Sequence, residues 1–322
     1  MTTAEILAAF PKLRVLVVGD VCLDRWCTYD PALALASAET GIPRTAVVAT
    51  EVTPGAAGTV ANNLAALGAG RVDVLGMVGD DGFGYELRRA LSARGISPDL
   101  LVEAPGIPTF TYTKLINRAS GAEDLARVDF IRTQPLPESV ERQIVARLED
   151  ARYDVILVSD QAETDHGGVV TPAVRAALGR VRETLIWVDS RLRAELFRDV
   201  VVKPNQQEAE AASRRLLGAV DYGEWRRRAN LRALVVTHGA DGALVLDEKG
   251  ERWSRARRVE KPVDICGAGD SFSAAAALAM KVTCDALQAA ELGNLVASIT
   301  IMKTGTGTAS PAEVLSRATG PA

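Results

Sequence analysis

Residues that would mark a secreted, metal-binding or membrane protein are scarce in this chain. It has only four cysteines and two histidines among 322 residues, and no C-x-x-C or other metal-ligand spacing surrounds them. This argues against a disulfide framework and favours reduced thiols in a cytoplasmic protein. Residues 1–11 lack the basic and apolar regions of a signal peptide. No uncharged apolar run reaches the roughly 18 residues that a membrane span needs.

Positive charge is not in excess either. The formal net charge is −4, and Lys and Arg are scattered along the chain rather than gathered in a stripe. The short basic run at 226–228 is better explained as a solvated helix face. We therefore expect neither a nucleic-acid partner nor a membrane partner. A hydrophobic content of 48% and a charged content of 24% are typical of a folded domain with one large core.

Short apolar runs that end in a polar residue or glycine alternate with helical patterns. The runs predict strands at 14–20, 71–80, 153–160, 183–190, 199–205 and 233–239. The patterns between them predict helices at 59–68, 83–94, 137–151, 171–181, 206–217 and 222–230. This alternation predicts an α/β fold with a central, mostly parallel sheet and helices on both faces. Ligands bind such sheets beyond the carboxyl ends of the strands. The polar residues expected at those ends are Asp20, Asp80, Asp160, Asp189 and Asn205.

Two segments, approximately 21–53 and 106–130, interrupt this alternation. Residues 43–53 predict a strand, 108–117 alternate in polarity, and 123–130 would return as a further strand. We expect these pieces to form a small, half-exposed sheet that acts as a lid, within one domain that spans the whole chain. Because exposed sheet faces favour association, a homodimer through the lid is the preferred assembly.

The stretch ICGAGDSFSA at 265–274 places a glycine-rich loop and an acid at the start of an apolar helix. Gly267 and Gly269 leave room for backbone N–H groups to turn toward one point, and the helix dipole adds positive potential there. Such a loop suits a transferring phosphoryl group, and Asp270 could accept the proton of a hydroxyl nucleophile. Asp is also a common helix N-cap, so the loop alone leaves a purely structural role open.

Four motifs occur in the order found in the PfkB/ribokinase family of carbohydrate kinases. They are PGAAGTVANNLAALGAGRVDVLGMVGDDGFGYEL (54–87), KPNQQEAE (203–210), VTHGADGALV (236–245) and DICGAGDSFSAA (264–275). The chain resembles this family from about residue 14 to 316. VVGDVCLDRW (17–26) and LVSD (157–160) also resemble the family's kinase module for heptose 7-phosphate. The resemblance implies a ribokinase-like fold and ATP-dependent transfer of a phosphoryl group to a hydroxyl of a sugar or sugar phosphate.

The resemblance also implies roles around the phosphoryl group. Asp270 would be the catalytic base, and the amides of Gly267, Ala268 and Gly269 would form the anion hole. Asn205 and Glu208 would organise Mg²⁺ through water, which suits the reluctance of this ion to lose its hydration shell. A first-turn helix acid is the structural alternative for Glu208, and a hairpin turn is the alternative for the glycines that follow. The residues implied to line the nucleotide are Asn205, Thr237, Gly239, Gly242 and Asn294.

The acceptor is implied to bind at the lid. Asp24 would hold sugar hydroxyls, and Gly55 would let the backbone approach the sugar. Three charged residues of the lid could reach a sugar phosphate, although lid charges are often only solvated; they are Lys114, Arg127 and Asp129. Asp189 and Arg191 are further candidates for facing phosphate.

Many members of this family respond to a monovalent cation. The corresponding region here is formed by Asp264, the Cys266 carbonyl and the backbone near Lys303 and Gly305, so the resemblance allows K⁺ as a further cofactor.

This chain departs from the family pattern beside the expected acceptor site. The usual Gly-Gly pair is Gly55-Ala56, and Thr59 stands where an Asn is expected. Ala56 adds a methyl group where the backbone should approach the ligand, which leaves the identity of the sugar open. A kinase for a neutral sugar such as ribose or fructose is one alternative, and a non-catalytic sugar or nucleotide sensor is another. An NAD-dependent oxidoreductase would need a G-x-G-x-x-G fingerprint after the first strand, and none is present.

Overall fold

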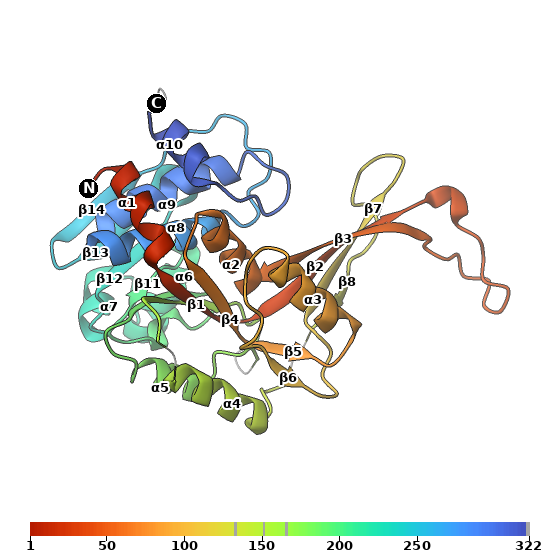
Figure 1. The fold of residues 1–322 in the computed structure, drawn as a ribbon, viewed down its shortest axis with the longest axis horizontal. Coiled ribbons are helices and arrows are strands. Elements are labelled where there is room, and N and C mark those ends of the chain that lie inside the picture. The colour runs from red at the N-terminus through yellow and green to blue at the C-terminus, as the bar shows by residue number, and fades with distance from the viewer. Residues whose placement is uncertain (132–133, 151, 165–166, 320–322) are drawn as a thin grey trace.

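The computed structural model describes residues 1–131, 134–150, 152–164 and 167–319 (Figure 1). Within this part, eight strands form one sheet in the order β14-β13-β12-β11-β10-β9-β1-β4. They are β1 (Arg14–Gly19), β4 (Arg71–Leu75), β9 (Val155–Asp160), β10 (Leu185–Ser190), β11 (Val201–Val202), β12 (Ala233–Thr237), β13 (Gly242–Asp247) and β14 (Gly250–Arg255). All neighbours are parallel except β13, which is antiparallel to both β12 and β14.

Helices cover both faces of this sheet. They are α1 (Thr3–Ala9), α2 (Ala57–Ala66), α3 (Gly82–Ser92), α4 (Glu138–Glu149), α5 (Pro172–Leu178), α6 (Gln206–Leu217), α7 (Tyr222–Arg228), α8 (Ala268–Thr283), α9 (Ala286–Thr300) and α10 (Pro311–Thr319). On β9, Val155 and Leu157 pack into one apolar core with α2, α8 and α9, whereas Ile156 and Val158 pack into another with α4 to α7. The predicted two-sided, mostly parallel sheet is therefore confirmed. Among the described helices, none combines the length and apolar character needed to cross a bilayer.

The single strand predicted at 71–80 is divided. Gly76 ends β4 because its Cα lies against the main chain, where a Cβ would come within 2.6 Å of the Gly19 carbonyl oxygen. The continuation, β5 (Met77–Gly79), leaves the main sheet and pairs in parallel with β6 (Val102–Ala104).

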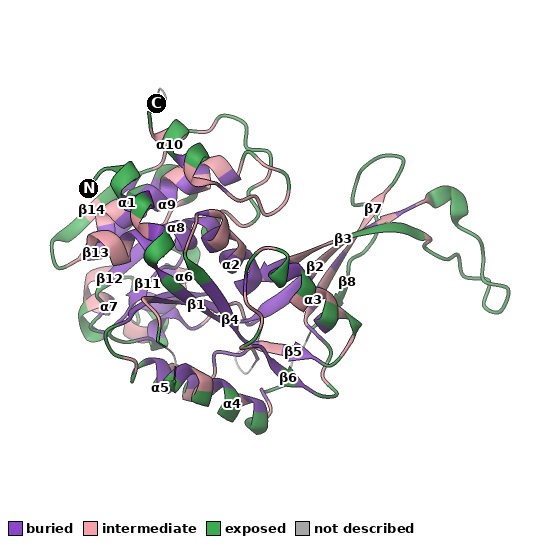
Figure 2. Cartoon of the chain, viewed as in Figure 1, coloured by how far each residue is buried: buried purple, intermediate pink, exposed green. Residues whose placement is uncertain are grey.

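The lid is a separate four-stranded sheet in the order β3-β2-β7-β8. Its strands are β2 (Val21–Tyr29), β3 (Val47–Ala56), β7 (Thr111–Asn117) and β8 (Val128–Phe130). The predicted small sheet is confirmed, but β2 was not predicted from the sequence. Its middle residues Asp24, Arg25 and Trp26 are half-buried, so the strand lacks a continuous apolar pattern. Figure 1 shows the β2–β3 hairpin projecting from the body, and its outer residues 31–45 are all exposed (Figure 2).

Candidate active site

Two cavities meet at the N-terminal end of α8. The lid cavity, of about 370 Å³, is lined by residues of the lid, of α2 and of the loop before α8. The α8–α9 cavity, of about 640 Å³, is lined by residues after β10, β11 and β12 and by α8 and α9. Among the described residues, Gln161 and Asp270 line both cavities. The acid singled out in the sequence therefore lies at their junction.

The Asp270 carboxyl is set up to exchange a proton near neutral pH. Its pKa is raised from 3.8 to about 7, mainly by desolvation and then by the negative charge of Asp189, while the Lys203 ammonium opposes the rise. A general base works best when its pKa lies near the operating pH. The position and the pKa of Asp270 both suit proton abstraction.

The loop before α8 presents two of its three predicted amides. Gly267 adopts a left-handed conformation (φ 76°) that favours glycine, and no side chain caps the helix there. Within the described part of the chain, the amides of Gly267 and Gly269 donate to no main-chain carbonyl. The Ala268 amide donates to the Ile265 carbonyl oxygen at 3.2 Å, because the loop closes a turn before the helix. The predicted role of the Ala268 amide in the anion hole is therefore not supported by this geometry.

Lys203 is a feature of the site that was not predicted from the sequence. It follows β11, is 3% exposed, and its Nζ lies 2.7 Å from Asp189 Oδ2. Ser273 of α8 donates to the same oxygen at 3.1 Å. Burial favours a lower pKa for Lys203, but Asp189 outweighs burial and keeps the pKa raised. The ammonium is 3.4 Å from where a Cβ on Gly269 would lie, so a buried cation sits beside the glycine-rich loop.

Asp24 and Gly55 lie on paired lid strands, but only Asp24 lines the lid cavity. A Cβ on Gly55 would lie 2.5 Å from Asp24 Oδ2. The close approach at Gly55 is therefore made by the Asp24 carboxylate, and the sugar contact expected of Gly55 stays a prediction. Burial raises the pKa of Asp24.

Charged side chains of both signs line the lid cavity, and its acids are Asp24, Glu163 and Asp270. Lys114 on β7, Arg127 before β8 and Arg191 after β10 all line it. Lys114 is 3.8 Å from Glu123, and the Arg127 guanidinium lies 5.0 Å from the centre of the Tyr112 ring.

Asp129 does not line the cavity. It pairs with Arg127 at 2.5 Å and accepts from the Thr113 amide at 3.3 Å. Asp129 therefore holds Arg127 in place, and its role as a substrate contact stays a prediction.

Comparison with known proteins assigns the chain to a family. The model described as pfkB family carbohydrate kinase matches residues 12–313. The chain belongs to the PfkB family. As a carbohydrate kinase it is a phosphotransferase with an alcohol acceptor, as the sequence predicted.

Curated relatives agree with this assignment. The kinase is 33% identical over 323 residues to the bifunctional protein HldE of Geobacter sulfurreducens, with 97% of this chain and 64% of the relative covered. It is 31% identical over 317 residues to HldE of Shewanella amazonensis, with 96% and 64% covered. The chain thus spans about 64% of the length of these relatives.

Solved structures share the ribokinase-like fold. Ribokinase of Thermotoga maritima has a TM-score of 0.72 at 18% identity, with 95% of this chain and 99% of that chain covered. Phosphofructokinase-2 of Escherichia coli, solved in complex with potassium, has a TM-score of 0.70 at 18% identity, with 95% and 98% covered.

Asn205 and Glu208 of the kinase cap α6 and also line the α8–α9 cavity. The Asn205 side chain accepts from the Glu208 amide at 2.9 Å, and Glu208 Oε2 accepts from the Asn205 amide at 2.8 Å. Burial and then Asp189 raise the pKa of Glu208. Glu208 is thus a first-turn acid of α6, which is the structural alternative considered for it. This capping uses Oε2 and leaves Oε1 available to a ligand in the cavity. Thr237 and Gly239 line the same cavity.

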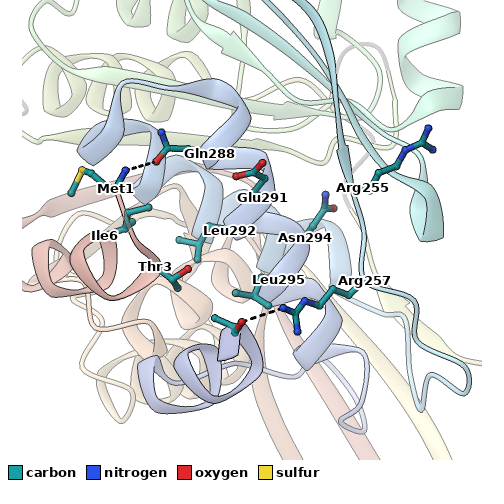
Figure 3. Close-up of a pocket in the computed structure, with 11 residues that line it drawn as sticks. Met1, Thr3, Ile6, Arg255, Arg257, Gln288, Glu291, Leu292, Asn294 and Leu295 are labelled. Carbon is teal, nitrogen blue, oxygen red and sulfur yellow. Dashed lines mark hydrogen bonds between the residues drawn. The ribbon is translucent and has the colours of Figure 1, made fainter. Parts of the chain in front are cut away.

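The other two residues predicted to contact the nucleotide, Asn294 and Gly242, both lie against β14. The Asn294 amide donates to the Ser254 carbonyl at 3.0 Å and to the Ser254 hydroxyl at 2.8 Å. Asn294 lines both the α8–α9 cavity and a smaller one of about 260 Å³ beside Ile6 and Leu292 (Figure 3). Gly242 lies in the β13–β14 ladder, where a Cβ would come within 2.1 Å of the Ser254 carbonyl oxygen. The close approach at Gly242 is to β14, and its nucleotide contact stays a prediction.

Three of the polar strand-end residues are not part of the site. Asp160 is buried and pairs with Arg193 and with the Ser190 hydroxyl. Asp20 accepts from the Gln161 amide at 2.9 Å and the Val169 amide at 2.7 Å. Desolvation and the charge of Asp160 raise the pKa of Asp20 to about 6. Asp80 is exposed. Asp20 and Asp160 support the site by fixing the chain on either side of it.

The predicted cation region joins two loops. Asp264 accepts from the Cys266 amide at 2.9 Å and from the Gly305 amide at 3.1 Å. Lys303 instead contacts Glu313 and the Thr308 carbonyl, both at 2.6 Å. In the described ranges, no three His, Cys, Asp or Glu side chains are grouped to hold a metal ion.

Proposed function

We propose that this kinase transfers the γ-phosphoryl group of ATP to a hydroxyl of a sugar phosphate. ATP would occupy the α8–α9 cavity, and the sugar would occupy the lid cavity. The observation that carries the proposal is the place of Asp270, which lines both cavities at the start of α8. A group at this junction can contact the hydroxyl and the phosphoryl group at once.

The chemistry follows from the residues around that junction. The acceptor hydroxyl oxygen forms a new bond to the γ-phosphorus, and the bond from that phosphorus to the bridging oxygen breaks, which releases ADP. Asp270 takes the hydroxyl proton. The free amides of Gly267 and Gly269 and the Lys203 ammonium lie where negative charge would develop on the transferring group. The lid covers the acceptor, which keeps water from competing with the sugar.

The donors on α6 fit a hydrated Mg²⁺ ion. Asn205 and Glu208 supply oxygen atoms at the wall of the α8–α9 cavity, and Asp189 lines the same cavity. Mg²⁺ prefers oxygen ligands and usually keeps several waters, so contact through water suits this arrangement. When bound, the ion would neutralise charge on the phosphates.

A monovalent cation near Asp264 is part of the proposal. Asp264 links the loop that ends at Gly267 to the loop at Gly305, so an ion held there would order the anion hole. Phosphofructokinase-2, a structural neighbour, was solved with potassium. ADP release that is unchanged when KCl replaces choline chloride would remove K⁺ from the proposal.

The charge of the lid cavity favours an anionic acceptor. Lys114, Arg127 and Arg191 line it together, and clustered cations are suited to a phosphate group. The resemblance to the heptose 7-phosphate kinase module and the similarity to HldE support a heptose phosphate in particular.

The test is ADP release measured across heptose, hexose and pentose phosphates and their neutral counterparts. We expect kcat/KM for a sugar phosphate to exceed that of the neutral sugar by at least tenfold. Equal or better turnover of ribose or fructose would refute the sugar-phosphate assignment. Sugar binding by calorimetry without ADP release from any acceptor would favour the sensor instead.

We also propose a homodimer through the lid. The support is a set of large apolar side chains that the described lid leaves exposed, namely Leu33, Leu35, Ile42, Val47, Val48 and Val128. Light scattering should give twice the chain mass of 34.1 kDa, and a monomer at micromolar concentration would contradict the proposal.

A further inference from the structure

Ala56 adopts a backbone conformation that favours glycine. It has φ 51° and ψ −117° and precedes α2 at the N-cap position. An L side chain is strained there, whereas glycine adopts the conformation freely. The sequence therefore retains a methyl group at a position where its removal would relieve strain. Such outliers cluster at ligand-binding sites, and Ala56 lines the lid cavity.

Thr59, one turn into α2, presents a second methyl group. It also lines the lid cavity, although it is only 2% exposed. Its hydroxyl donates to the Pro54 carbonyl at 3.4 Å, and its Cγ2 lies 3.5 Å from where a Cβ on Gly267 would be. The hydroxyl is thus turned to the main chain and the methyl toward the loop before α8. We call Ala56 and Thr59 the methyl wall.

The methyl wall lines the same cavity as Asp24, the acid that would hold the sugar. Asp24 Oδ2 is 2.5 Å from the Cβ position of Gly55, the residue before Ala56. An acceptor hydroxyl that faces Asp24 finds a hydrogen-bond acceptor. A hydroxyl that faces the wall meets methyl groups and loses its water without a replacement partner. An apolar wall of this kind discriminates against an added hydroxyl by up to about a hundredfold.

We infer that Ala56 and Thr59 select a deoxy sugar phosphate, one that presents C–H rather than a hydroxyl beside the group held by Asp24. This inference rests on the proposed function, because it takes the lid cavity as the acceptor site. It assigns the two departures from the family motif to acceptor choice rather than to loss of activity.

The test compares matched acceptors in the wild type and in variants that remove the methyl groups. The acceptors are 2-deoxyglucose 6-phosphate with glucose 6-phosphate, and 2-deoxyribose 5-phosphate with ribose 5-phosphate. The variants are Ala56→Gly, Thr59→Ser and their combination, and none of them adds bulk or charge. Ala38→Gly, at an exposed position of the β2–β3 hairpin that lines neither cavity, is the control.

In the wild type we expect kcat/KM for the deoxy member of at least one pair to be about tenfold higher. In the double variant that ratio should fall to within about twofold of one, because the hydroxylated sugar gains activity. Ala38→Gly should leave the ratio unchanged. Equal ratios in the wild type and the double variant would overturn the inference.

Calorimetry with a non-hydrolysable ATP analogue separates this inference from the proposed function. Dissociation constants that show the expected ratios without ADP release would support the methyl wall but overturn the kinase proposal. Turnover with the same deoxy-to-hydroxylated ratio in the wild type and the double variant would support the kinase proposal but overturn the methyl wall. Absence of binding by every acceptor would overturn both.

Discussion

Replacing Asp270 with asparagine should inactivate the kinase and stabilise its fold. The substitution keeps the shape of the side chain but removes its ability to accept a proton. General-base catalysis contributes roughly 10²–10⁴-fold, so kcat should fall by that factor while ATP binding is retained.

The gain in stability follows from the cost of ionising this carboxyl in the folded state. Each tenfold change in an acidity constant corresponds to about 1.36 kcal/mol, and the pKa of Asp270 rises from 3.8 to about 7 on folding. Because the folded pKa is the higher one, the contribution of this carboxyl to native stability is greatest below pH 4 and is lost as the pH rises through 7. Asp270→Asn should therefore raise the free energy of unfolding by about 4 kcal/mol at pH 8 but only about 2 kcal/mol at pH 5.

Urea unfolding at the two pH values and coupled measurement of ADP release test both halves of this prediction. Asp80→Asn is the matched control, because Asp80 is exposed at the end of another strand, and it should change neither quantity. Unchanged turnover would refute the role of Asp270 as base. A gain in stability that is absent or independent of pH would show that the carboxyl is not desolvated, and the reasoning on its pKa would fail.

Three further predictions test the surroundings. Lys203→Met should lower kcat by at least tenfold. It should also shift the acidic limb of the pH–rate profile to higher pH, because Lys203 lowers the pKa of Asp270. An acidic limb at the same pH would contradict this. Ala56→Gly should raise the free energy of unfolding by about 1 kcal/mol in urea, and destabilisation would mean that the methyl packs more favourably than its strain costs. Arg193→Met should reduce stability by about 3–5 kcal/mol, because it leaves Asp160 buried without its cation; a loss under 1 kcal/mol would show that Asp160 finds another partner.

The sequence predicted the parallel strands of the main sheet, because each carries a continuous apolar run, but it did not predict the antiparallel β13 or the edge strand β14. It did not predict β2, whose Asp24, Arg25 and Trp26 face the lid cavity and interrupt that pattern. Glycines were assigned to ligand approach, yet Gly242 accommodates β14 and Gly55 accommodates Asp24. A glycine in a sequence indicates that something comes close, but only the fold shows what it is.

Lys203 illustrates the same limit for charged residues. It stands in the KPN motif used to recognise the family, but a lysine after a short strand is usually solvent-exposed. Its role depends on Asp189 and Ser273, which come from β10 and α8 and are distant in sequence. Asp270 was found because its signal is local, with the glycines, the acid and the helix start all adjacent.

Only Asp20 separates the last residue of β1 from the first residue of β2, and Ala56 at the end of β3 is followed directly by α2, so these two connections join the lid closely to the body. The Asp20 carboxylate also accepts hydrogen bonds from the amides of Gln161 and Val169. Gln161 lines both the lid cavity and the α8–α9 cavity. A movement of the lid would therefore shift the main chain at Gln161, which lies between the cavities proposed for the sugar and the nucleotide. Faster hydrogen exchange at those two amides in the empty enzyme than in the substrate-bound one would reveal this coupling.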